Sequence, residues 1–411
     1  LHSLFSIMQY DFLILGGAGM QGRIAARDLL ESGHSVFLAD LYKEKAENLL
    51  KRPKTGFAFI DLRDIPAIVA LIKKVKAPVV LNCAEGDWDL NVYEACLETK
   101  THVLDLGSDI PMTKKQIAMH ADFAKNDLIA ITGCGSTPGI NNVLLHHAHQ
   151  LFDSLDTIEV GFAWDSNIKK FVVPFSIESI IEEFTAPAAT IKDGQWIMKT
   201  PMETIEEREF REIGKQKCFI VRHPETFTFY HYNKKDGLKN LRFYAGFPDH
   251  SINTIRTFID TGLGSSDPVI VDGKEVAPDA TLTQVLKTLP YPEGYTEKEN
   301  LWVHVWGEKD GKPKEILMEC IVNTLSDWQD AGCNIDIGMP ASIMAQMVKD
   351  GRITARGSYP PGPVVPTEEF FRELHNRGMV VYQNGEIING KKPKKSKSFF
   401  KKIFQRRIFA K

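Results

Sequence analysis

The sequence predicts an α/β fold, in which a doubly wound parallel sheet is followed by a second, α+β domain with a mainly antiparallel sheet. Two observations carry this prediction. In residues 8–135, short apolar runs alternate with helix-like segments, which is the pattern of βαβ units. From Ser154 on, segments rich in β-branched and aromatic residues are separated by Asp-Gly turns, which is the pattern of antiparallel hairpins.

The first domain, 8–135, is expected to consist of strands and helices in strict alternation. The strands are predicted at 11–15, 35–39, 57–60, 78–82, 102–105 and 128–132. The helices are predicted at 23–32, 43–51, 66–75, 92–99 and 114–125. Because helices connect parallel strands on either side, both faces of this sheet should be covered.

The second domain is predicted to span 136–340. Its strands are expected at 157–163, 226–231, 255–261 and 302–306, with 312–324 pairing with the last of these across a Lys-Asp-Gly-Lys turn. A helical segment, 341–390, follows. In it we expect helices at 341–349 and 368–377, the second capped by Thr367, and an extended Pro-rich connector at Tyr359 between them.

Composition excludes several classes of protein. There is no run of 18 apolar residues, so we expect no membrane-spanning helix. The six cysteines never form a C-x-x-C pair, so neither a metal site nor a disulfide framework is expected, and a cytoplasmic location with reduced thiols fits best. Residues 1–7 lack the basic and apolar regions of a secretory signal, and Met8 is the expected start.

The last 21 residues form a separate feature. Residues 391–411 hold ten Lys or Arg and no acidic residue, interleaved with Phe and Ile. At helical spacing, the apolar side chains would gather on one face, and such a tail could lie on an anionic membrane surface. A disordered basic tail is the alternative. Nucleic-acid binding is not expected, because the rest of the chain is acidic and would oppose it.

The sharpest motif is a glycine-rich turn between the first predicted strand and the first helix. It comprises Gly17, Gly19, Met20, Gln21 and Gly22. Gly17 permits the tight turn, Gly19 lets the backbone approach a pyrophosphate, and Gly22 lets helix and strand pack closely. The free N–H groups at the helix start would then hold the phosphates of a dinucleotide. The turn therefore predicts a Rossmann domain.

An acidic residue in the right place favours NAD over NADP as the cofactor. Asp40 ends the second strand, 18 residues after Gly22, where a carboxylate accepts hydrogen bonds from ribose hydroxyls and repels a 2′-phosphate. Other strand ends should complete the cofactor crevice, since ligands bind beyond the carboxyl ends of parallel strands. These further candidates are Asp61, Leu62, Asn82, Cys83, Asp105 and Leu106.

Together these landmarks resemble the saccharopine dehydrogenase/reductase family, over about residues 8–385. The matching segments begin with 14–22, 26–29 and 103–107. They continue with Gly-Ser-Thr-Pro-Gly-Ile-Asn-Asn at 135–142, Gly-Met-Pro-Ala-Ser-Ile-Met-Ala-Gln-Met at 338–347, and Gly-Ser-Tyr-Pro-Pro at 357–361. The glycine turn alone is common to many families, whereas the segments after residue 135 narrow the resemblance.

The resemblance implies an inserted substrate domain and a C-terminal segment that returns to the Rossmann domain. It implies NAD(P)-dependent oxidation of a C–N bond in an amino acid, in a homodimer. Asp105, Gly135 and Pro138 would then lie near the nicotinamide and the substrate. We add as substrate-site candidates Cys134, Phe175, Ser176 and Arg242.

One departure from the family concerns an Arg-Tyr-x-Gly stretch, which here starts with Phe243. Carboxylate binding would have to come from elsewhere, with Arg222, Arg242 and Arg256 as candidates. As catalytic residues we predict Asp105 and His250, the latter next to Asp249, which could orient it. His223 and His231 are the alternatives. Glu183 is expected to face either solvent, which we favour, or an amino group.

The predicted function is thus hydride transfer at a C–N bond of a small amino-acid substrate such as saccharopine or lysine. Alternatives within the class are lysine 6-dehydrogenase and a carboxynorspermidine dehydrogenase-type activity. The alternative from another class is a non-catalytic dinucleotide-binding protein tethered by its basic tail.

Overall fold

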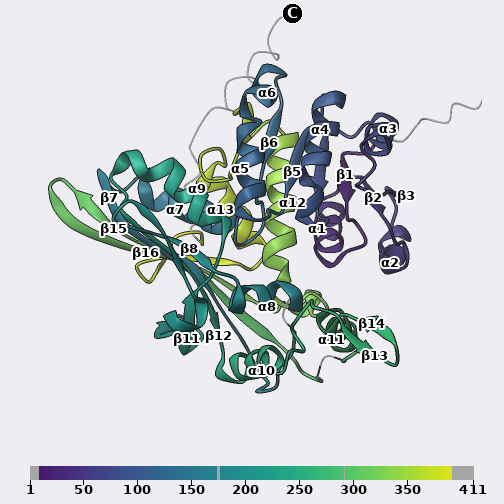
Figure 1. The fold of residues 1–411 in the computed structure, drawn as a ribbon. Helices are drawn as coiled ribbons and strands as arrows, with labels where there is room; N and C mark the ends of the chain where they lie inside the picture. The colour runs from purple at the N-terminus through teal and green to yellow at the C-terminus, as the bar shows by residue number, and fades with distance from the viewer. Residues whose placement is uncertain (1–8, 174–175, 291, 391–411) are drawn as a thin grey trace, which may run out of the picture.

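A computed structural model describes residues 9–173, 176–290 and 292–390, and it contains two large sheets (Figure 1). The first is a parallel sheet of seven strands in the order β17-β6-β5-β4-β1-β2-β3. Its strands are β1 Phe12–Leu15, β2 Val36–Asp40, β3 Thr55–Phe59, β4 Val79–Asn82, β5 His102–Asp105, β6 Ile129–Ile131 and β17 Gly357–Tyr359. The predicted α/β class and parallel sheet are confirmed.

Both faces of the parallel sheet are covered, as the alternation of side chains along β1 shows. Phe12 and Ile14 join one core cluster, whereas Leu13 and Leu15 join another on the opposite face. The helices of this domain are α1 Met20–Glu31, α2 Glu47–Leu50, α3 Ile65–Val75, α4 Asp89–Thr99, α5 Ile110–Ala118 and α6 His120–Lys125, with short 3-10 turns η1 Glu44–Ala46 and η2 Gly86–Trp88. α3 and α4 cover the Leu13 face, and α1 covers the other.

The second sheet has ten strands and is mixed. Its main order is β10-β11-β12-β7-β15-β16-β18-β19, with β8 on β12 and β9 on β8. Only β12 and β7 pair in parallel among these strands of the described chain. The strands are β7 Ser154–Ser166, β8 Ala188–Lys192, β9 Gln195–Lys199, β10 Glu206–Phe210, β11 Gly214–Ile220, β12 Asn240–Phe247, β15 Glu297–Lys309, β16 Lys312–Asn323, β18 Val380–Gln383 and β19 Glu386–Ile387.

The predicted hairpin is confirmed, because β15 pairs with β16 in the expected register from Lys309↔Lys312 onward. Asp310 and Gly311 both have positive φ, as a two-residue hairpin turn requires. The remaining elements are α7 Ile140–His149, α8 Ile177–Thr185, α9 Pro224–Asn233, α10 Asp249–Asp260, α11 Pro278–Lys287, α12 Ile335–Lys349, α13 Thr367–Asn376, the small hairpin of β13 Val269–Val271 and β14 Lys274–Val276, and the 3-10 turns η3 Pro201–Thr204, η4 Lys234–Asp236, η5 Ser326–Trp328 and η6 Gly332–Asn334.

Two strand predictions were wrong. Residues 226–231 belong to helix α9, and residues 255–261 largely to helix α10. α9 starts with Pro224 and is buried on most sides, so its apolar and β-branched residues give no helical periodicity. In α10, Ile252 and Ile255 are both buried, and their separation of three residues is a helical spacing. The β-branched composition of the segment nevertheless led to the prediction of a strand.

The chain returns to its first domain at the end, as the family resemblance implied. α12 begins at Ile335, before the predicted residue 341, and lies along α1, where a Cβ on Gly338 would come within 2.6 Å of the Ile24 side chain (Figure 1). β17 then joins the parallel sheet beside β6, so the predicted extended connector starts as a strand. Phe175, residues 1–7 and the 391–411 tail lie outside the described residues.

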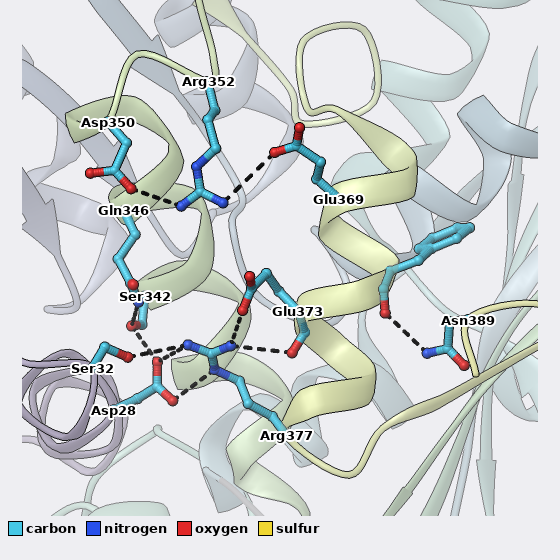
Figure 2. A network of polar contacts seen from close by, with 11 residues as sticks. Asp28, Ser32, Ser342, Gln346, Asp350, Arg352, Glu369, Glu373, Arg377 and Asn389 are labelled. Carbon is cyan, nitrogen blue, oxygen red and sulfur yellow. Dashed lines mark hydrogen bonds and ion pairs between the residues drawn. The ribbon is translucent and has the colours of Figure 1, made fainter. Parts of the chain in front are cut away.

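A buried ion pair fastens this return. The Arg377 guanidinium, at the end of α13, binds both carboxylate oxygens of Asp28 on α1, at 2.7 and 3.0 Å (Figure 2). The Ser342 hydroxyl of α12 donates to the same carboxylate at 2.5 Å. Both charged side chains are nearly buried, at 11% and 8% exposure. Three helices from the two ends of the chain thus meet at one carboxylate.

Candidate functional site

The glycine turn has the shape that a pyrophosphate needs. Gly16 has φ +68, and a Cβ there would lie 2.5 Å from the Ala84 backbone nitrogen. A Cβ on Gly22 would lie 2.2 Å from the Gly16 carbonyl oxygen, so only glycine permits this contact between turn and helix. α1 begins with Met20 and Gln21 right after Gly19. Its first N–H groups are therefore placed at the carboxyl end of β1, ready to bind an anion.

Asp40 lies against this turn. Its Oδ2 accepts a hydrogen bond from the Ala18 N–H at 2.8 Å, and its Oδ1 accepts from the Tyr42 N–H at 3.1 Å. The carboxylate is thus fixed at the end of β2, in the position where the ribose of a dinucleotide is expected.

Asp61, at the next strand end, is bound by Arg63, which lowers the pKa of the Asp61 carboxyl to about 2. Leu62 is buried in the core cluster that also contains Leu13.

Asp105 positions two turns. Its Oδ1 accepts from the backbone N–H groups of Gly107 and Gly133, at 2.7 and 3.0 Å, and its Oδ2 accepts from the Tyr93 hydroxyl at 2.6 Å. The side chain is 1% exposed and lines none of the cavities described below. Asp105 therefore fixes the Gly107 and Gly133 turns, which form the floor of the predicted cofactor crevice. It is not placed to contact the substrate, as the predicted acid or base would be.

A buried network extends this floor to the neighbouring strand. Gln116 donates to both Asp105 and Asp89, and Asn82 donates to Asp89 at 2.8 Å. Burial raises the pKa of both aspartates. The predicted cofactor residue Asn82 is thus an internal member of the network, whereas Cys83 and Leu106 are only partly buried at the same strand ends.

The segment after β6 packs over these turns. A Cβ on Gly107 or on Gly133 would lie 2.6 or 2.5 Å from the Pro138 ring, so Pro138 sits directly on both turns. Gly135 lies close to Ile337 of α12, and Cys134 is fully buried, with its thiol directed at the Ile131 carbonyl. The structure therefore brings Gly135 and Pro138 to the crevice and keeps Cys134 as a packing residue.

A cavity lies between the two sheets, beside this segment. Its lining residues come from the β6–α7 connection, β7, α8, the residue before α9, β15, η6 and the start of α12. They are Ser136, Thr137, Phe162, Trp164, Glu183, His223, Glu297, Glu299, Cys333, Asn334, Asp336 and Ile337. We refer to it as the acidic cavity, because four of these side chains are carboxyl groups. Gln21 of the glycine turn donates to Asn334 at 3.0 Å and so connects the phosphate-binding helix to its wall.

Burial leaves the carboxyl groups of the acidic cavity short of compensating charge. Burial and the neighbouring Glu182 raise the pKa of Glu183 to about 8. Burial also raises the pKa of Glu297, although Tyr295 and the Cys333 N–H donate to it at 2.7 Å each. Glu299 and Asp336 share a hydrogen bond, and burial raises the pKa of both.

Two of these carboxyl groups have an oxygen with no protein partner. Among the described residues, Glu183 Oε2 and Asp336 Oδ2 are buried atoms without a hydrogen bond, and so is the indole nitrogen of Trp164. A buried acceptor without a partner is costly, typically about 1–3 kcal/mol. A ligand that carries several N–H donors and positive charges would satisfy the two carboxyl oxygens, whereas the indole N–H needs an acceptor. The expectation that Glu183 faces solvent was wrong, because α8 buries its Ile and Phe face and turns Glu183 to the cavity.

A second recess adjoins the acidic cavity and shares Glu183 and His223 with it. Its other lining residues include Ser108, Asp109, Glu182 and Arg222. Arg222 pairs with Glu182 at this recess. Of the three arginines considered for carboxylate binding, Arg222 alone lines it.

The other predicted substrate and catalytic residues lie elsewhere. Arg242 pairs with Glu159 at 2.6 Å, on the face of β12 opposite to Phe243, and Arg256 is exposed on α10. His250 lines a different cavity together with Asp165, which points to the opposite sheet face from Trp164. Ser176 caps α8, accepting from the Ser179 N–H at 3.3 Å. The structure therefore does not bring His250, Arg242 or Ser176 into the acidic cavity.

Three carboxyl groups of the cavity were not predicted. Glu297 and Glu299 are two residues apart along β15, so their side chains lie on the same face of the strand. That spacing could have suggested a common site. Asp336 lies just before the late motif at 338–347, but nothing in the sequence joins it to β15. Phe243, the first residue of the Phe-Tyr-Ala-Gly stretch, stacks on the His223 ring, with centroids 3.9 Å apart.

Comparison with known proteins agrees with this architecture. Residues 12–131 match the saccharopine dehydrogenase NADP binding domain, and residues 135–379 match the saccharopine dehydrogenase C-terminal domain. A carboxynorspermidine synthase of Vibrio alginolyticus is 29% identical over 73% of this chain and 76% of its own length. A carboxyaminopropylagmatine dehydrogenase of Synechocystis is 24% identical over 93% of this chain and 98% of its own length.

Solved structures show the same fold. Saccharopine dehydrogenase (L-Glu forming) from Saccharomyces cerevisiae superimposes with a TM-score of 0.72, covering 92% of this chain and 100% of its own, at 14% identity. Homospermidine synthase from Legionella pneumophila, in complex with NAD, gives a TM-score of 0.66 over 96% and 94% of the two chains, at 11% identity. The predicted resemblance is confirmed by the two domain matches. The chain belongs to the saccharopine dehydrogenase family of NAD(P)-dependent oxidoreductases.

Proposed function

We propose that this protein is a dehydrogenase acting on the secondary amine of a carboxylated polyamine, a substrate in which an amino-acid unit is joined to a chain that bears further ammonium groups. The acidic cavity is the observation that carries the proposal. Its carboxyl oxygens without partners suit ammonium groups, and Phe162 and Trp164 suit the alkyl chain between them. Saccharopine carries three carboxylates of its own, which the same cavity would repel.

The neighbouring recess supplies what the other end of this substrate needs. Arg222, which pairs with Glu182 in this structure, would release Glu182 and bind the carboxylate of the amino-acid unit in its place. The names of the two relatives, carboxynorspermidine synthase and carboxyaminopropylagmatine dehydrogenase, describe compounds of this class. Such a substrate would place its secondary amine between the two recesses, beside Pro138 and the strand ends of the parallel sheet.

For the cofactor we propose NAD, on the strength of Asp40. The glycine turn and the start of α1 would hold the pyrophosphate, and the Asp40 carboxylate would bind ribose hydroxyls. The nicotinamide, when bound, exchanges a hydride with the substrate carbon next to the nitrogen. The crevice floor held by Asp105 would orient the reacting groups, which can supply much of the rate enhancement.

The decisive experiment is an absorbance assay at the NADH band. Purified protein is given NAD or NADP with carboxynorspermidine, carboxyaminopropylagmatine, saccharopine or lysine. We expect NAD reduction with a carboxylated polyamine and none with saccharopine. Turnover with saccharopine or lysine alone would refute the proposal. NADH binding without turnover of any compound would favour the non-catalytic alternative.

Removing charge from the acidic cavity should weaken substrate binding. We expect Glu299→Gln and Asp336→Asn each to raise KM for the carboxylated polyamine by about 10- to 100-fold, because a hydrogen bond to a charged group is worth roughly 1.5–3 kcal/mol. Steady-state kinetics measure this. The matched control is Glu308→Gln, an exposed residue on the same strand β15, which should leave KM unchanged. Equal effects of control and cavity variants would contradict the role of the cavity.

Polyamine binding should release protons. The pKa of Glu183, about 8, exceeds its ordinary 4.5, so this group's contribution to stability is complete below pH 4.5 and is lost as the pH rises through 8. A bound ammonium group favours the carboxylate. We therefore expect tighter substrate binding at pH 8 than at pH 6, with proton release at pH 7. Titration calorimetry in phosphate and in Tris buffer would show it as a buffer-dependent enthalpy, and Glu183→Gln should reduce that dependence.

Two further proposals concern the surroundings of the enzyme. The six cysteines are all free thiols, and five of them are buried, which supports a cytoplasmic location. None of the helices in the described part of the chain is long and apolar enough to cross a membrane. A homodimer and a membrane contact of the basic tail stay predictions, which light scattering and vesicle sedimentation of the full chain would test.

A further inference from the structure

We propose that His223, oriented by Glu225, is the group that transfers the proton to and from the substrate nitrogen, an inference that rests on the proposed function. Hydride can leave the carbon beside an amine only when the nitrogen has lost its proton. A group at the site must therefore take that proton. His223 lies immediately before α9 and lines both the acidic cavity and the recess of Arg222.

Two contacts fix the imidazole ring. Its Nδ1 pairs with the Oε2 of Glu225, whose side chain is completely buried in the first turn of α9. Its face stacks on Phe243, with an interplanar angle of 9°. Because the carboxylate holds the hydrogen on Nδ1, the nitrogen left for a ligand is Nε2. A carboxylate that orients an imidazole and stabilises the charge formed on it is the arrangement of a histidine general base.

The position of the ring fits the reaction. The ammonium-bearing chain would lie on one side of His223, among the carboxyl groups of the acidic cavity. The amino-acid carboxylate would lie on the other, near Arg222 and the turn that follows β5. The secondary amine connects these two parts, so it would lie closest to the residues common to both recesses, Glu183 and His223. No other histidine of the described chain lines either recess.

The reaction conserves atoms and electrons at each stage. His223 Nε2 would take the proton of the secondary ammonium. The oxidised dinucleotide, when bound, would supply the two-electron oxidant for the hydride on the adjacent carbon, so that a protonated C=N bond is left in the substrate. Water adds to that carbon, and the C–N bond breaks. The electron pair goes to nitrogen, and His223 returns its proton to the departing primary amine. The products are a carbonyl compound, an amine and the reduced cofactor, with one proton released to water overall.

Glu183 is the competing candidate for the same proton, since it too borders both recesses and its pKa lies at about 8. The structure favours His223, because Glu225 and Phe243 fix its ring, whereas Glu183 Oε2 has no partner. The charged groups that face His223 are Glu225 in α9, Glu182 and Glu183 of α8, Asp109 before α5, Arg222, and Glu297, Glu299 and Asp336 of the acidic cavity. The pH dependence of kcat, measured for variants of His223 and of Glu183, therefore distinguishes the two candidates.

The test uses the full chain with a carboxylated polyamine that the wild-type protein oxidises. We expect His223→Gln to lower kcat by about 10²–10⁴-fold and to remove one limb of the kcat–pH profile. The affinities for NADH and for the amine product should stay within a few-fold of wild type. Glu225→Gln should lower kcat by a smaller factor and shift the same limb. His231→Gln, on α9 but outside both recesses, is the matched control and should change neither.

A second variant guards against misfolding. His223→Ala should regain activity when imidazole is added, and a collapsed site would not. A kcat for His223→Gln within a few-fold of wild type, with both limbs of the profile kept, would overturn the proposal. So would a profile that loses its limb in Glu183→Gln but not in His223→Gln. Failure of the wild-type protein to oxidise any carboxylated polyamine would instead refute the proposed function, before the variants are compared.

Discussion

Gly22→Ala should lower the affinity for NADH by about 100-fold or more. The new Cβ would lie 2.2 Å from the Gly16 carbonyl oxygen and 2.8 Å from the Gly17 Cα, and backbone atoms cannot yield as a flexible side chain does. Turn and helix must then separate. An overpacking cost of about 1–3 kcal/mol combines with displacement of the N–H groups that would bind the pyrophosphate. Titration of NADH fluorescence measures the effect.

The control for this variant lies at the other end of the same helix. Gly33 has φ +92, and a Cβ added to it would meet no atom within 4 Å, so Gly33→Ala introduces backbone strain without touching the turn. It should lower thermal stability and leave the NADH affinity as in wild type. Equal losses of NADH affinity in both variants would mean that the binding defect reflects general destabilisation, and the phosphate role of the turn would be unsupported.

Arg377→Ala should destabilise the protein by about 3–5 kcal/mol, the usual cost of leaving one partner of a buried ion pair alone. The Asp28 carboxylate would lose two charge-assisted hydrogen bonds and keep only the Ser342 hydroxyl. Denaturant unfolding without cofactor measures the loss. Arg352→Ala is the matched control: Arg352 contacts Asp350 and Glu369 in the same region but is 28% exposed, and its loss should cost less than about 1 kcal/mol (Figure 2).

A double substitution sharpens this prediction. Asp28→Leu combined with Arg377→Met removes both charges, and the pair should recover most of the stability that Arg377→Ala loses. That outcome would show that the cost lies in the unpaired charge. If instead Arg377→Ala is no more harmful than Arg352→Ala, the ion pair does not fasten the C-terminal return, and the packing of α12 on α1 must suffice.

Much of the fold could be predicted because its determinants are local. The apolar runs of β1 to β6 and the glycine turn are short-range patterns, and the β15–β16 hairpin follows from one Asp-Gly turn. The errors in α9 and α10 have the opposite origin. There the composition favours strands, and burial on most sides of α9 removes the periodicity that would mark a helix.

The candidate site was harder to predict, since its parts meet only through tertiary structure. The four carboxyl groups of the acidic cavity come from α8, β15 and α12, and no spacing in the sequence brings Glu183 next to Asp336. Asp105 was found as a strand-end carboxylate, but its five donors could be seen only in the folded protein. His223 was named only as an alternative to His250, which had Asp249 beside it in the sequence, and the pairing of His223 Nδ1 with Glu225 could be seen only in the folded protein.

The return of the chain to its first sheet has a consequence for biosynthesis. β6 ends at Ile131, whereas its neighbour β17 starts at Gly357 and the helix that covers α1 starts at Ile335. At roughly 5–20 residues per second, a ribosome needs on the order of 10–45 s to deliver this last strand. During that interval the emerging N-terminal third of the chain has an open sheet edge and a bare apolar flank on α1. Nascent chains of this protein should therefore depend on chaperones, and a fragment that ends near residue 135 should aggregate.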